Sequence, residues 1–282
     1  MSEHPSEASP AIGAPPDRLV ASLALGVIAG FLSGMFGVGG GIVIVPGLVL
    51  LMRMDQRLAH GTSLAAALPI SMAATVGFAA SGNIDWVAAL PILLGGATGA
   101  LIGVRALQRV PLQGLRLGFA AVLAASAVRL LITLAPAHAH AQTSLLSLVG
   151  LVALGLASGV LAGLMGVGGG IVIVPALLLE WGLSAPVAKG TSLVVIIGTA
   201  LVATIQNSRK RNVDLRLALR VGLAGVGASF AGSLIAAHLT GALANDLFAA
   251  LLILVALRLV LVARSMRKKE RLGKRLEPVE RT

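Results

Sequence analysis

An internal duplication is the dominant feature of this sequence. When Gly30–Pro46 (GFLSGMFGVGGGIVIVP) is laid on Gly159–Pro175 (GVLAGLMGVGGGIVIVP), thirteen of seventeen residues are identical, and the offset of 129 then holds to the end of each half. Each copy contains one glycine-rich break within long apolar segments. Paired breaks of this kind mark the binding sites of membrane transporters built from repeats. The duplication therefore constrains both fold and function.

The composition indicates a membrane protein. With 57% hydrophobic residues, 12% charged residues and a mean hydropathy of +0.96, the chain has too little polar material to cover a soluble globule. Most of its apolar stretches reach the ~20 residues that cross a bilayer, but 40–53 and 169–180 are too short. We predict an all-α polytopic fold with about 8–10 hydrophobic segments. The stretches are 19–37, 40–53, 61–81, 87–105, 113–134, 147–166, 169–180, 190–206, 217–237 and 244–263.

The predicted organisation is two membrane repeats joined and flanked by short polar segments. The boundaries are a polar N-terminal tail at 1–18, repeat 1 at 19–135, an interhalf loop at 136–147, repeat 2 at 148–263 and a basic tail at 264–282. The first tail lacks the basic start of a secretory signal, so the first apolar segment is expected to be retained. Three small-xxx-small series of glycines predict close helix packing: Gly26, Gly30 and Gly34, their images Gly155, Gly159 and Gly163, and Gly95, Gly99 and Gly103.

Charge predicts that the two halves are inverted. The basic C-terminal run should be cytoplasmic by the positive-inside rule, which places 209–211 inside and the loop 180–189 outside. In the first half, the arginine pairs Arg53/Arg57 and Arg105/Arg109 occupy the images of the outside loops, so a parallel duplication would put them on the wrong side. We predict an inverted repeat in the bacterial inner membrane, with either an odd number of crossings per half or three crossings plus a re-entrant hairpin, and with both termini in the cytoplasm.

The glycine motif predicts a broken helix whose tip lies at membrane depth. Its glycines permit backbone conformations forbidden to other residues, while Pro46 and Pro175 lack an N–H group. A helix that starts after each tip directs free N–H groups and its positive dipole end at the bundle centre, which suits an anion. The candidate oxyanion cradle comprises Gly39, Gly40, Gly41, Gly168, Gly169 and Gly170. The alternative is that these glycines only allow tight packing at a bend.

Hydroxyl residues form a second candidate group. Thr62 and Ser63, with their images Thr191 and Ser192, are expected to open the helix after each short segment. There they can cap the helix or bond a substrate oxygen, and capping is the ordinary role.

Further polar pairs are auxiliary candidates. Lys189 could attract an anion at the outer mouth and its image His60 could titrate near neutrality, although a solvated interfacial side chain is the commoner role. The pairs Asn83/Asp85 and Asn212/Asp214 are expected to cap helices.

The arginines Arg129 and Arg258 are images of each other near the ends of their segments. They can snorkel to the interface or act inwards on a charged substrate. Glu180, Gln206 and Asn207 lack polar images, which points to a difference between the halves.

Other site types find little support. No Ser/His/Asp or paired-carboxylate constellation lies within the apolar segments, so we predict no catalytic activity and no cofactor. His138 and His140 are too few for a metal site, and nucleotide loops are excluded because no third glycine or Gly-Lys-Ser/Thr follows. The basic tail is expected to contact lipid headgroups. Nucleic acid is not an expected partner, since the tail lacks interleaved aromatics.

The doubled G-x-x-G-x-G-G-G-x-x-x-x-P pattern, with its Gly-Thr-Ser and Asn-x-Asp companions, resembles the TauE/SafE sulfite exporter family of bacterial membrane proteins. The resemblance covers roughly residues 19–263 in both copies. It implies export or uptake of small anions, with sulfite, sulfonates and related sulfur or carboxylate compounds as the substrate class. The direction of transport and the particular anion do not follow from it.

The sequence therefore favours a secondary transporter with a central anion site between the halves. Export of an anion from a negative-inside cell is favoured by ~2.3 kcal/mol per charge per 100 mV, so a uniporter would suffice. An anion channel and a non-transporting membrane subunit are the alternatives. Self-association into a homo-oligomer is left open.

Overall fold

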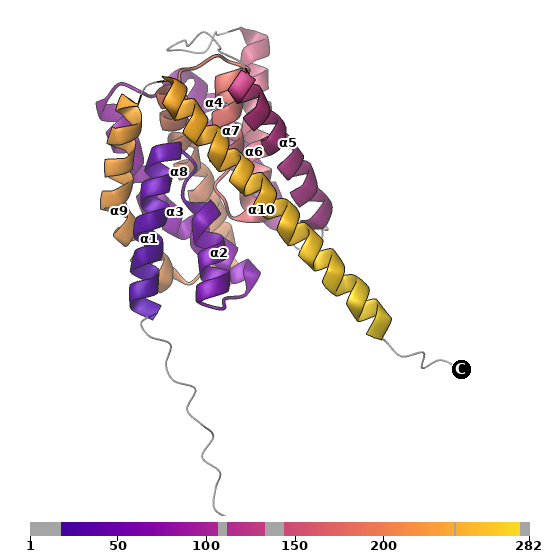
Figure 1. Ribbon diagram of the computed structural model, residues 1–282. Helices are drawn as coiled ribbons and strands as arrows, with labels where there is room; N and C mark the ends of the chain where they lie inside the picture. Colours follow the sequence, from indigo (N-terminus) through magenta and orange to yellow (C-terminus); the bar gives the residue numbers. More distant parts are fainter. Residues whose placement is uncertain (1–17, 107–111, 133–143, 240, 277–282) are drawn as a thin grey trace, which may run out of the picture.

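The computed structural model describes residues 18–106, 112–132, 144–239 and 241–276, and these form ten α-helices (Figure 1). The predicted all-α fold is confirmed, with one helix for each apolar stretch. In chain order the helices are α1 (Arg18–Phe36), α2 (Gly41–Leu51), α3 (Gln56–Ala80), α4 (Trp86–Ala106), α5 (Leu112–Ile132), α6 (Leu145–Met165), α7 (Gly170–Leu179), α8 (Ala185–Arg209), α9 (Leu215–His238) and α10 (Gly241–Leu276).

Six of these helices, α1, α3, α4, α6, α8 and α9, are long and apolar enough to cross a membrane. The short helices α2 and α7 contain 11 and 10 residues, which corresponds to ~15–17 Å and is less than the ~30 Å of hydrocarbon. Helices α3 and α8 begin at Gln56 and Ala185, five residues before the apolar stretches suggested. In α3 the polar first turn, with Gln56 and Arg57, hides the helix start from a hydropathy reading, and Asp55 caps the helix through the Arg57 N–H. Helix α8 instead begins with Ala185 and Pro186 after the N-cap residue Ser184.

Helices α1 and α2 form an antiparallel hairpin. A Cβ on Gly40 would lie 3.2 Å from the Ala29 carbonyl, and one on Gly47 would contact the Leu25 side chain, so residue numbers run in opposite directions along the contact. The chain returns to the end from which α1 started, and α3 begins there. Gly169 makes the equivalent approach to Ser158, at 3.0 Å from its carbonyl oxygen. Each half thus contains a hairpin followed by three longer helices, which is one of the two predicted arrangements.

The two halves run in opposite directions through the bundle. Along the contact between α1 and α9, Gly26 meets Val221 and Gly34 meets Ser229, so these helices are parallel. Helix α3 is parallel to α9 as well, whereas α4, α6 and α8 are parallel to one another. The five-residue loops 81–85 and 210–214 turn the chain back between the two groups. Because α1 and its image α6 belong to different groups, the repeat is inverted.

The small-xxx-small glycines hold the halves together. A Cβ on Gly30 would lie 2.7 Å from the Gly225 Cα, and one on Gly159 would lie 2.8 Å from the Gly96 carbonyl carbon. Helix α1 therefore packs on α9 of the other half, and α6 packs on α4, with backbones in direct contact. Such contacts replace the hydrophobic drive that is missing in lipid. The packing role predicted for these glycines is confirmed.

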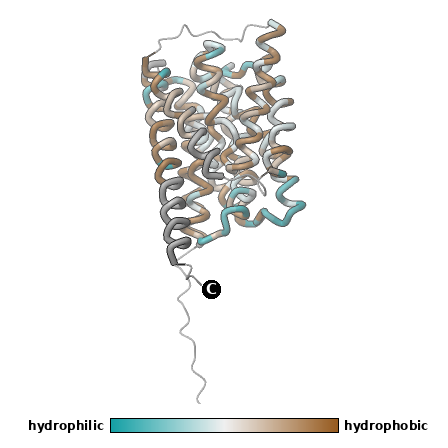
Figure 2. The backbone as a smooth tube through the Cα atoms, turned by 90° about the vertical axis from the view of Figure 1, so that its right-hand side faces the viewer, coloured by the Kyte–Doolittle hydropathy of each residue, from teal (hydrophilic) through white to brown (hydrophobic). Residues whose placement is uncertain are grey.

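Positive charge gathers at one end of the bundle, which we call the basic end. The Lys210 Nζ donates to the Val104 carbonyl at 3.1 Å, so the ends of α8 and α4 meet there. Hydrophilic segments cluster at this lower end in Figure 2, and α10 ends on the same side as α1 begins (Figure 1). The described basic residues of this end include Arg53, Arg57, Arg105, Arg209, Lys210, Arg211, Arg216 and Arg220. Arg109 lies outside the described residues.

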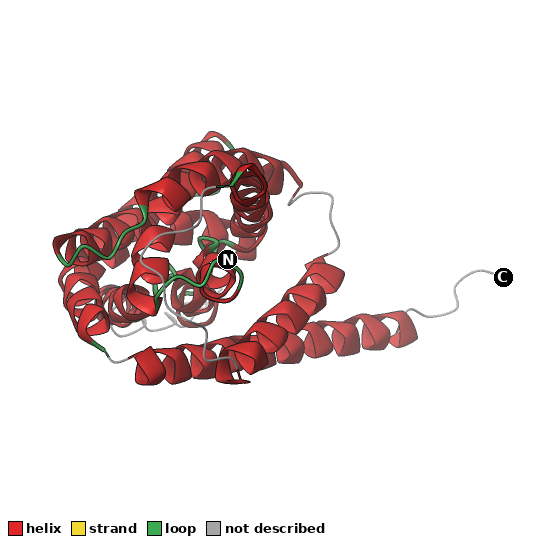
Figure 3. Ribbon diagram, turned by 90° about the horizontal axis from the view of Figure 1, so that it is seen from above, coloured by secondary structure: helices red, strands yellow, loops and turns green. Residues whose placement is uncertain are grey.

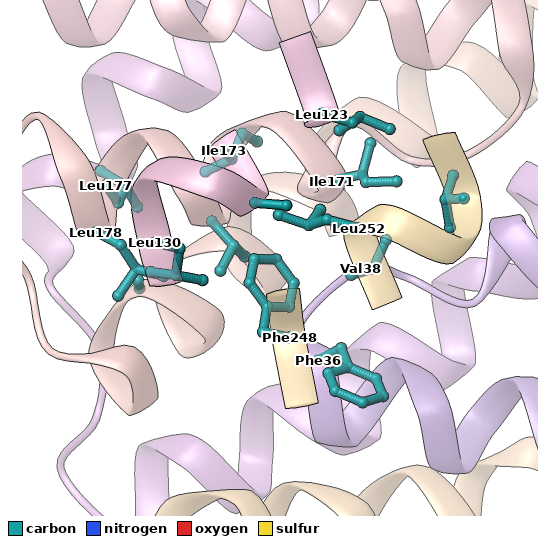
Figure 4. Packing of buried hydrophobic residues seen from close by; sticks show 14 of the residues in the cluster. Phe36, Val38, Leu123, Leu130, Ile171, Ile173, Leu177, Leu178, Phe248 and Leu252 are labelled. Carbon is teal, nitrogen blue, oxygen red and sulfur yellow. The ribbon is translucent and has the colours of Figure 1, made fainter. Parts of the chain in front are cut away.

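Helices α5 and α10 cross on one side of the bundle (Figures 1 and 3). The largest buried cluster connects them to the hairpins: Val38 precedes α2, Ile171 begins α7, Leu123 lies on α5 and Leu252 on α10 (Figure 4). Because residues of the glycine loops pack directly on this helix pair, a change in its position would reach the hairpin tips.

Candidate functional site

Each short helix begins at a left-handed glycine. Gly40 and Gly169 are the N-cap residues of α2 and α7, with φ of 72° and 80°. The preceding Gly39 and Gly168 also have positive φ, 79° and 85°. L-residues avoid this conformation, so the sequence supplies glycine in both copies. The predicted breaks are therefore present where the motif indicated them.

The two glycine loops meet at mid-height of the bundle. A Cβ on Gly41 would lie 2.5 Å from the Gly166 carbonyl oxygen, and one on Gly170 would lie 2.5 Å from that of Gly37. The side chain of Ile196, near the middle of the 25-residue α8, approaches both Gly39 and Gly168. Tight packing is thus one established role of the loops.

The loop N–H groups are not used for internal bonding. In the described part of the chain, the N–H groups of Gly39, Gly40 and Gly41 donate no hydrogen bond to the protein, and those of Gly168, Gly169 and Gly170 behave alike. All six residues are buried. The packing role and the predicted anion cradle are therefore compatible. Packing involves the Cα atoms and carbonyl oxygens of the loops, and their N–H groups stay available to bind an anion.

The hydroxyl residues join the halves and do not cap helices. Ser63 Oγ donates to the Gly166 carbonyl at 3.0 Å, and Ser192 Oγ donates to the Gly37 carbonyl at 3.0 Å. The prediction that these residues open α3 and α8 is wrong, since the N-cap positions are Asp55 and Ser184. Each serine bridges from its own half to the glycine loop of the other.

The threonines make a second symmetric pair of bonds between the halves. Thr62 Oγ1 accepts from the Asp214 N–H at 3.0 Å, and Thr191 Oγ1 accepts from the Asp85 N–H at 2.9 Å. Both threonines are fully buried. Neither threonine is among the residues that line the two cavities described below.

The Asn-x-Asp motifs anchor the helices that follow them. Asp85 Oδ1 accepts from the N–H groups of Val87 and Ala88, and Asp214 Oδ1 accepts from that of Leu217. Capping by the aspartates is confirmed. The asparagines contribute differently, because the carbonyl oxygens of Asn83 and Asn212 lie against Gly190 and Gly61, the residues before the threonines.

Lys189 and His60 are buried, not interfacial. Lys189 is 1% exposed, so the expectation of a residue at the outer mouth is wrong. Its Nζ lies 5.9 Å from the centre of the Phe36 ring, and that ring lies 6.2 Å from the ring of Phe248 (Figure 4). His60 is 5% exposed and lines a cavity. Lys189 and His60 occupy equivalent places in the two halves. The Cα of Lys189 packs against Gly37, the Cα of His60 packs against Gly166, and each glycine is the first of the loop in the opposite half.

The cavity lined by His60, here called the Arg258 cavity, has a volume of about 120 Å³. It extends from the start of α2 at Gly41 to Gln56, the first residue of α3 at the basic end. Its polar side chains are those of Gln56, His60 and Arg258, and none of the described lining residues is acidic. A guanidinium group, an imidazole and a helix N-terminus thus surround one space, which favours a negatively charged ligand.

A second cavity, here called the Arg129 cavity, has a volume of about 280 Å³ and lies between α5 and α7. It extends from Ile171 to Glu180, at the end of the bundle opposite the basic end. Arg129 forms an ion pair with Glu180 there. Ile171 lines both cavities, so they approach each other at the start of α7.

The two image arginines have different partners. Arg258 Nη1 donates to the Ile42 carbonyl at 2.9 Å. Four residues later stands Pro46, whose missing N–H leaves that carbonyl without its helical donor, and Arg258 supplies the replacement. Arg129 instead binds the carboxylate of Glu180. Arg258 thus binds the backbone of the other half, whereas Arg129 binds a side chain of the other half, and the action of either arginine on a substrate stays a prediction.

Comparison with known proteins identifies the fold's relatives. The model of the family described as sulfite exporter TauE/SafE matches residues 4–130 and 151–280 of this chain. The chain belongs to the sulfite exporter TauE/SafE family. Its two matched segments correspond to the two repeats, so the resemblance noted in the motifs is confirmed.

Curated relatives of this TauE/SafE protein carry transporter names. A "Probable membrane transporter protein" of Xylella fastidiosa is 28% identical over 247 residues, which cover 86% of this chain and 95% of the relative. One of Bacillus subtilis is 28% identical over 262 residues, covering 84% and 92%. No solved structure matches the chain. These names support a role in membrane transport and specify no substrate.

Two features of this TauE/SafE protein were not found by sequence reasoning. Gln56 lies in the Arg258 cavity, although nothing in its sequence context marked it. The bond from Arg258 to Ile42 had a signal, namely a proline four residues after a carbonyl at the broken helix, but the donor is 216 residues away. Within the described ranges no cluster of metal-ligating side chains is found, and His138 and His140 lie outside those ranges.

Proposed function

We propose that this protein is a secondary transporter of small anions, with sulfite, sulfonates and related sulfur or carboxylate anions as its substrate class. The observation that carries the proposal is the Arg258 cavity, in which a guanidinium, a buried imidazole and the N-terminal end of α2 converge on a space of about 120 Å³ without a described acidic neighbour. That volume suits an anion of a few heavy atoms. The family description and the relatives' names support the transport role.

The proposed mechanism is alternating access around the glycine loops. The Arg258 and Arg129 cavities share Ile171 as a lining residue and extend towards opposite ends of the bundle. An anion held by Arg258 and the α2 N-terminus would pass to the α7 N-terminus as the hairpins shift against the pair α5 and α10. The free N–H groups of both loops would bind the anion as it passes the centre, where non-helical backbone is tolerated if protein buries it or if it lines a cavity.

The proposed orientation puts the basic end in the cytoplasm of a bacterial cell, within the inner membrane. The concentration of arginine and lysine at one end supports it through the positive-inside rule. Both termini would then be cytoplasmic. An anion leaving the cell would move from the Arg258 cavity towards the Arg129 cavity, down the membrane potential.

The test is uptake by proteoliposomes of sulfite, a sulfonate, acetate and chloride. We expect saturable flux of sulfite or the sulfonate that is accelerated by the same anion on the far side, which separates a carrier from a channel. Gly40→Leu should remove the flux. The matched control is Gly227→Leu, because Gly227 has no atom within 4 Å of its Cβ position. Folded protein without flux of any of the four anions would contradict the proposal.

A further inference from the structure

The two cavities are images of each other under the repeat. Four lining positions of the Arg258 cavity correspond, at the offset of 129, to four of the Arg129 cavity. The pairs are Ile42 and Ile171, Pro46 and Pro175, Val255 and Ser126, and Arg258 and Arg129. An inverted repeat places such images at opposite ends of one pathway. A site formed in one cavity therefore has a counterpart in the other.

The proline chemistry is also the same in both cavities. Pro175 removes the helical donor of the Ile171 carbonyl just as Pro46 does for Ile42. The guanidinium of Arg258 bonds the Ile42 carbonyl, but that of Arg129 is held by Glu180, the C-cap residue of α7. The image of Glu180 is Leu51, which has no charge to offer. The Arg129 cavity thus has a carboxylate where the image position is apolar, and it lacks counterparts of Gln56 and His60, whose images Ala185 and Lys189 do not line it.

We propose that the Arg129 cavity is a second anion site and that Glu180 occupies it in this structure as a tethered anion. A carboxylate and a small oxyanion present similar pairs of oxygens to a guanidinium fork. They would compete for Arg129, and the anion would bind when the Glu180 side chain swings away. The side chains of Arg129 and Glu180 are about half exposed, 54% and 55%, so this exchange needs no unfolding of α7.

The competition makes the two ends of the pathway unequal. An anion that enters from the basic end meets a cavity without a described carboxylate, whereas one that enters from the other end must first displace Glu180. The tethered carboxylate thereby raises the KM for the anion at the Glu180 end, while the concentration gradient and the membrane potential set the direction of net movement. This inference rests on the proposed transport of anions and adds a site and a regulatory residue to it.

The experiment compares Glu180→Gln with the unmodified protein in right-side-out and inverted vesicles loaded for sulfite flux. The substitution keeps the side-chain shape and removes its charge. We expect the KM for sulfite at the Glu180 end to fall about threefold, the factor of a typical exposed ion pair, while the KM at the basic end stays unchanged. Asp246→Asn removes another exposed carboxylate from the Glu180 end and should change neither value.

Two further variants test the site itself. Arg129→Gln should raise the KM at the Glu180 end and abolish the effect of Glu180→Gln when the two are combined. Leu51→Glu should place the missing carboxylate near the Arg258 cavity and raise the KM at the basic end. Leu51 is 65% exposed, so the substitution removes little packing.

The outcomes separate the two proposals. Saturable sulfite flux in the unmodified protein with an unaltered KM at the Glu180 end of Glu180→Gln would overturn the tethered-anion inference and leave the transporter standing. An equal change at both ends would also overturn it, because loosening of the contact between α5 and α7 would then explain the result. Absence of anion flux in the unmodified, folded protein would overturn the proposed function and this inference with it.

Discussion

The contacts at the centre of the molecule are nearly the same in both halves, whereas the contacts of Arg129 and Arg258 differ. The serine bonds to the glycine loops and the threonine bonds to the loops 81–85 and 210–214 have images of nearly the same length, 3.0 and 3.0 Å for the serines and 3.0 and 2.9 Å for the threonines. At the arginines the images diverge, because Arg258 bonds a helix carbonyl and Arg129 bonds a carboxylate. The symmetric contacts form a shared frame, whereas the contacts of the two arginines distinguish the halves.

This difference suggests how an inverted repeat can work as a transporter. Two halves with the same local chemistry can adopt each other's conformation, so a contact present in one half describes an alternative state of the other. In that state Arg129 would bond the Ile171 carbonyl and Arg258 would release that of Ile42. The contacts at the loops would persist, since both halves already share them.

Substitutions of the glycines at which α1 packs on α9 and α6 packs on α4 should have the largest effect on stability. The effect should be similar at both contacts. Gly30→Leu and Gly159→Leu each force a side chain into the backbone of a neighbouring helix, Gly225 or Gly96. We expect a loss of about 3 kcal/mol or more in the free energy of unfolding for both, as in overpacked cores. Thermal unfolding in detergent measures it, with Gly227→Leu as control. A stable Gly159→Leu variant and an unfolded Gly30→Leu variant would show that the two helix contacts are not equivalent.

Substitutions at the loop tips should abolish transport but leave the bundle assembled. Gly40→Leu and Gly169→Leu each add a side chain at a left-handed residue, which costs about 1–2 kcal/mol, and obstruct the space around the free N–H groups. Sulfite flux in proteoliposomes should fall to background for both variants. Their elution in detergent should match that of the unmodified protein. Normal flux in either variant would contradict a pathway through both tips.

Substitutions of the arginines should separate the halves. Loss of the charged donor in Arg258→Gln should raise the KM for sulfite at the basic end about tenfold or more, since charged hydrogen bonds contribute about 1.5–3 kcal/mol. Arg129→Gln should leave that KM within about twofold, because Glu180 already engages this side chain. Initial rates in vesicles of known orientation give both values. Equal effects at the basic end would show that the arginines are interchangeable.

Removal of the bonds between the halves should have the smallest effect. Ser63→Ala and Ser192→Ala each delete one buried hydrogen bond at 3.0 Å and should cost about 1 kcal/mol apiece. The two values should agree, because the contacts are images. Thr98→Val, which removes a hydroxyl bonded only within its own helix, serves as the control. Clearly unequal losses of unfolding free energy for the two variants would indicate that the hydrogen bonds between the halves are not equivalent.

Much of the fold follows from local sequence. Glycine spacing, hydropathy and the charges of the loops are local signals, and they predicted the helices, the broken hairpins and the inversion. The contacts of Ser63 and Lys189 could not be predicted, because their partners are distant in the sequence. Ser63 bonds a carbonyl 103 residues away, and Lys189 is covered by Phe36 from the other half. Such contacts arise when the two inverted halves pack together, and the residues next to Ser63 or Lys189 in the sequence do not indicate them.

The decisive measurement is the labelling of two image positions from each side of the membrane. The chain contains no cysteine, so Val255→Cys in the Arg258 cavity and Ser126→Cys in the Arg129 cavity can each be probed with a membrane-impermeant thiol reagent. We predict that Val255→Cys reacts from the basic end, that Ser126→Cys reacts from the opposite end, and that sulfite protects both. Labelling of the two positions from the same side would contradict an inverted pathway between repeat-related cavities.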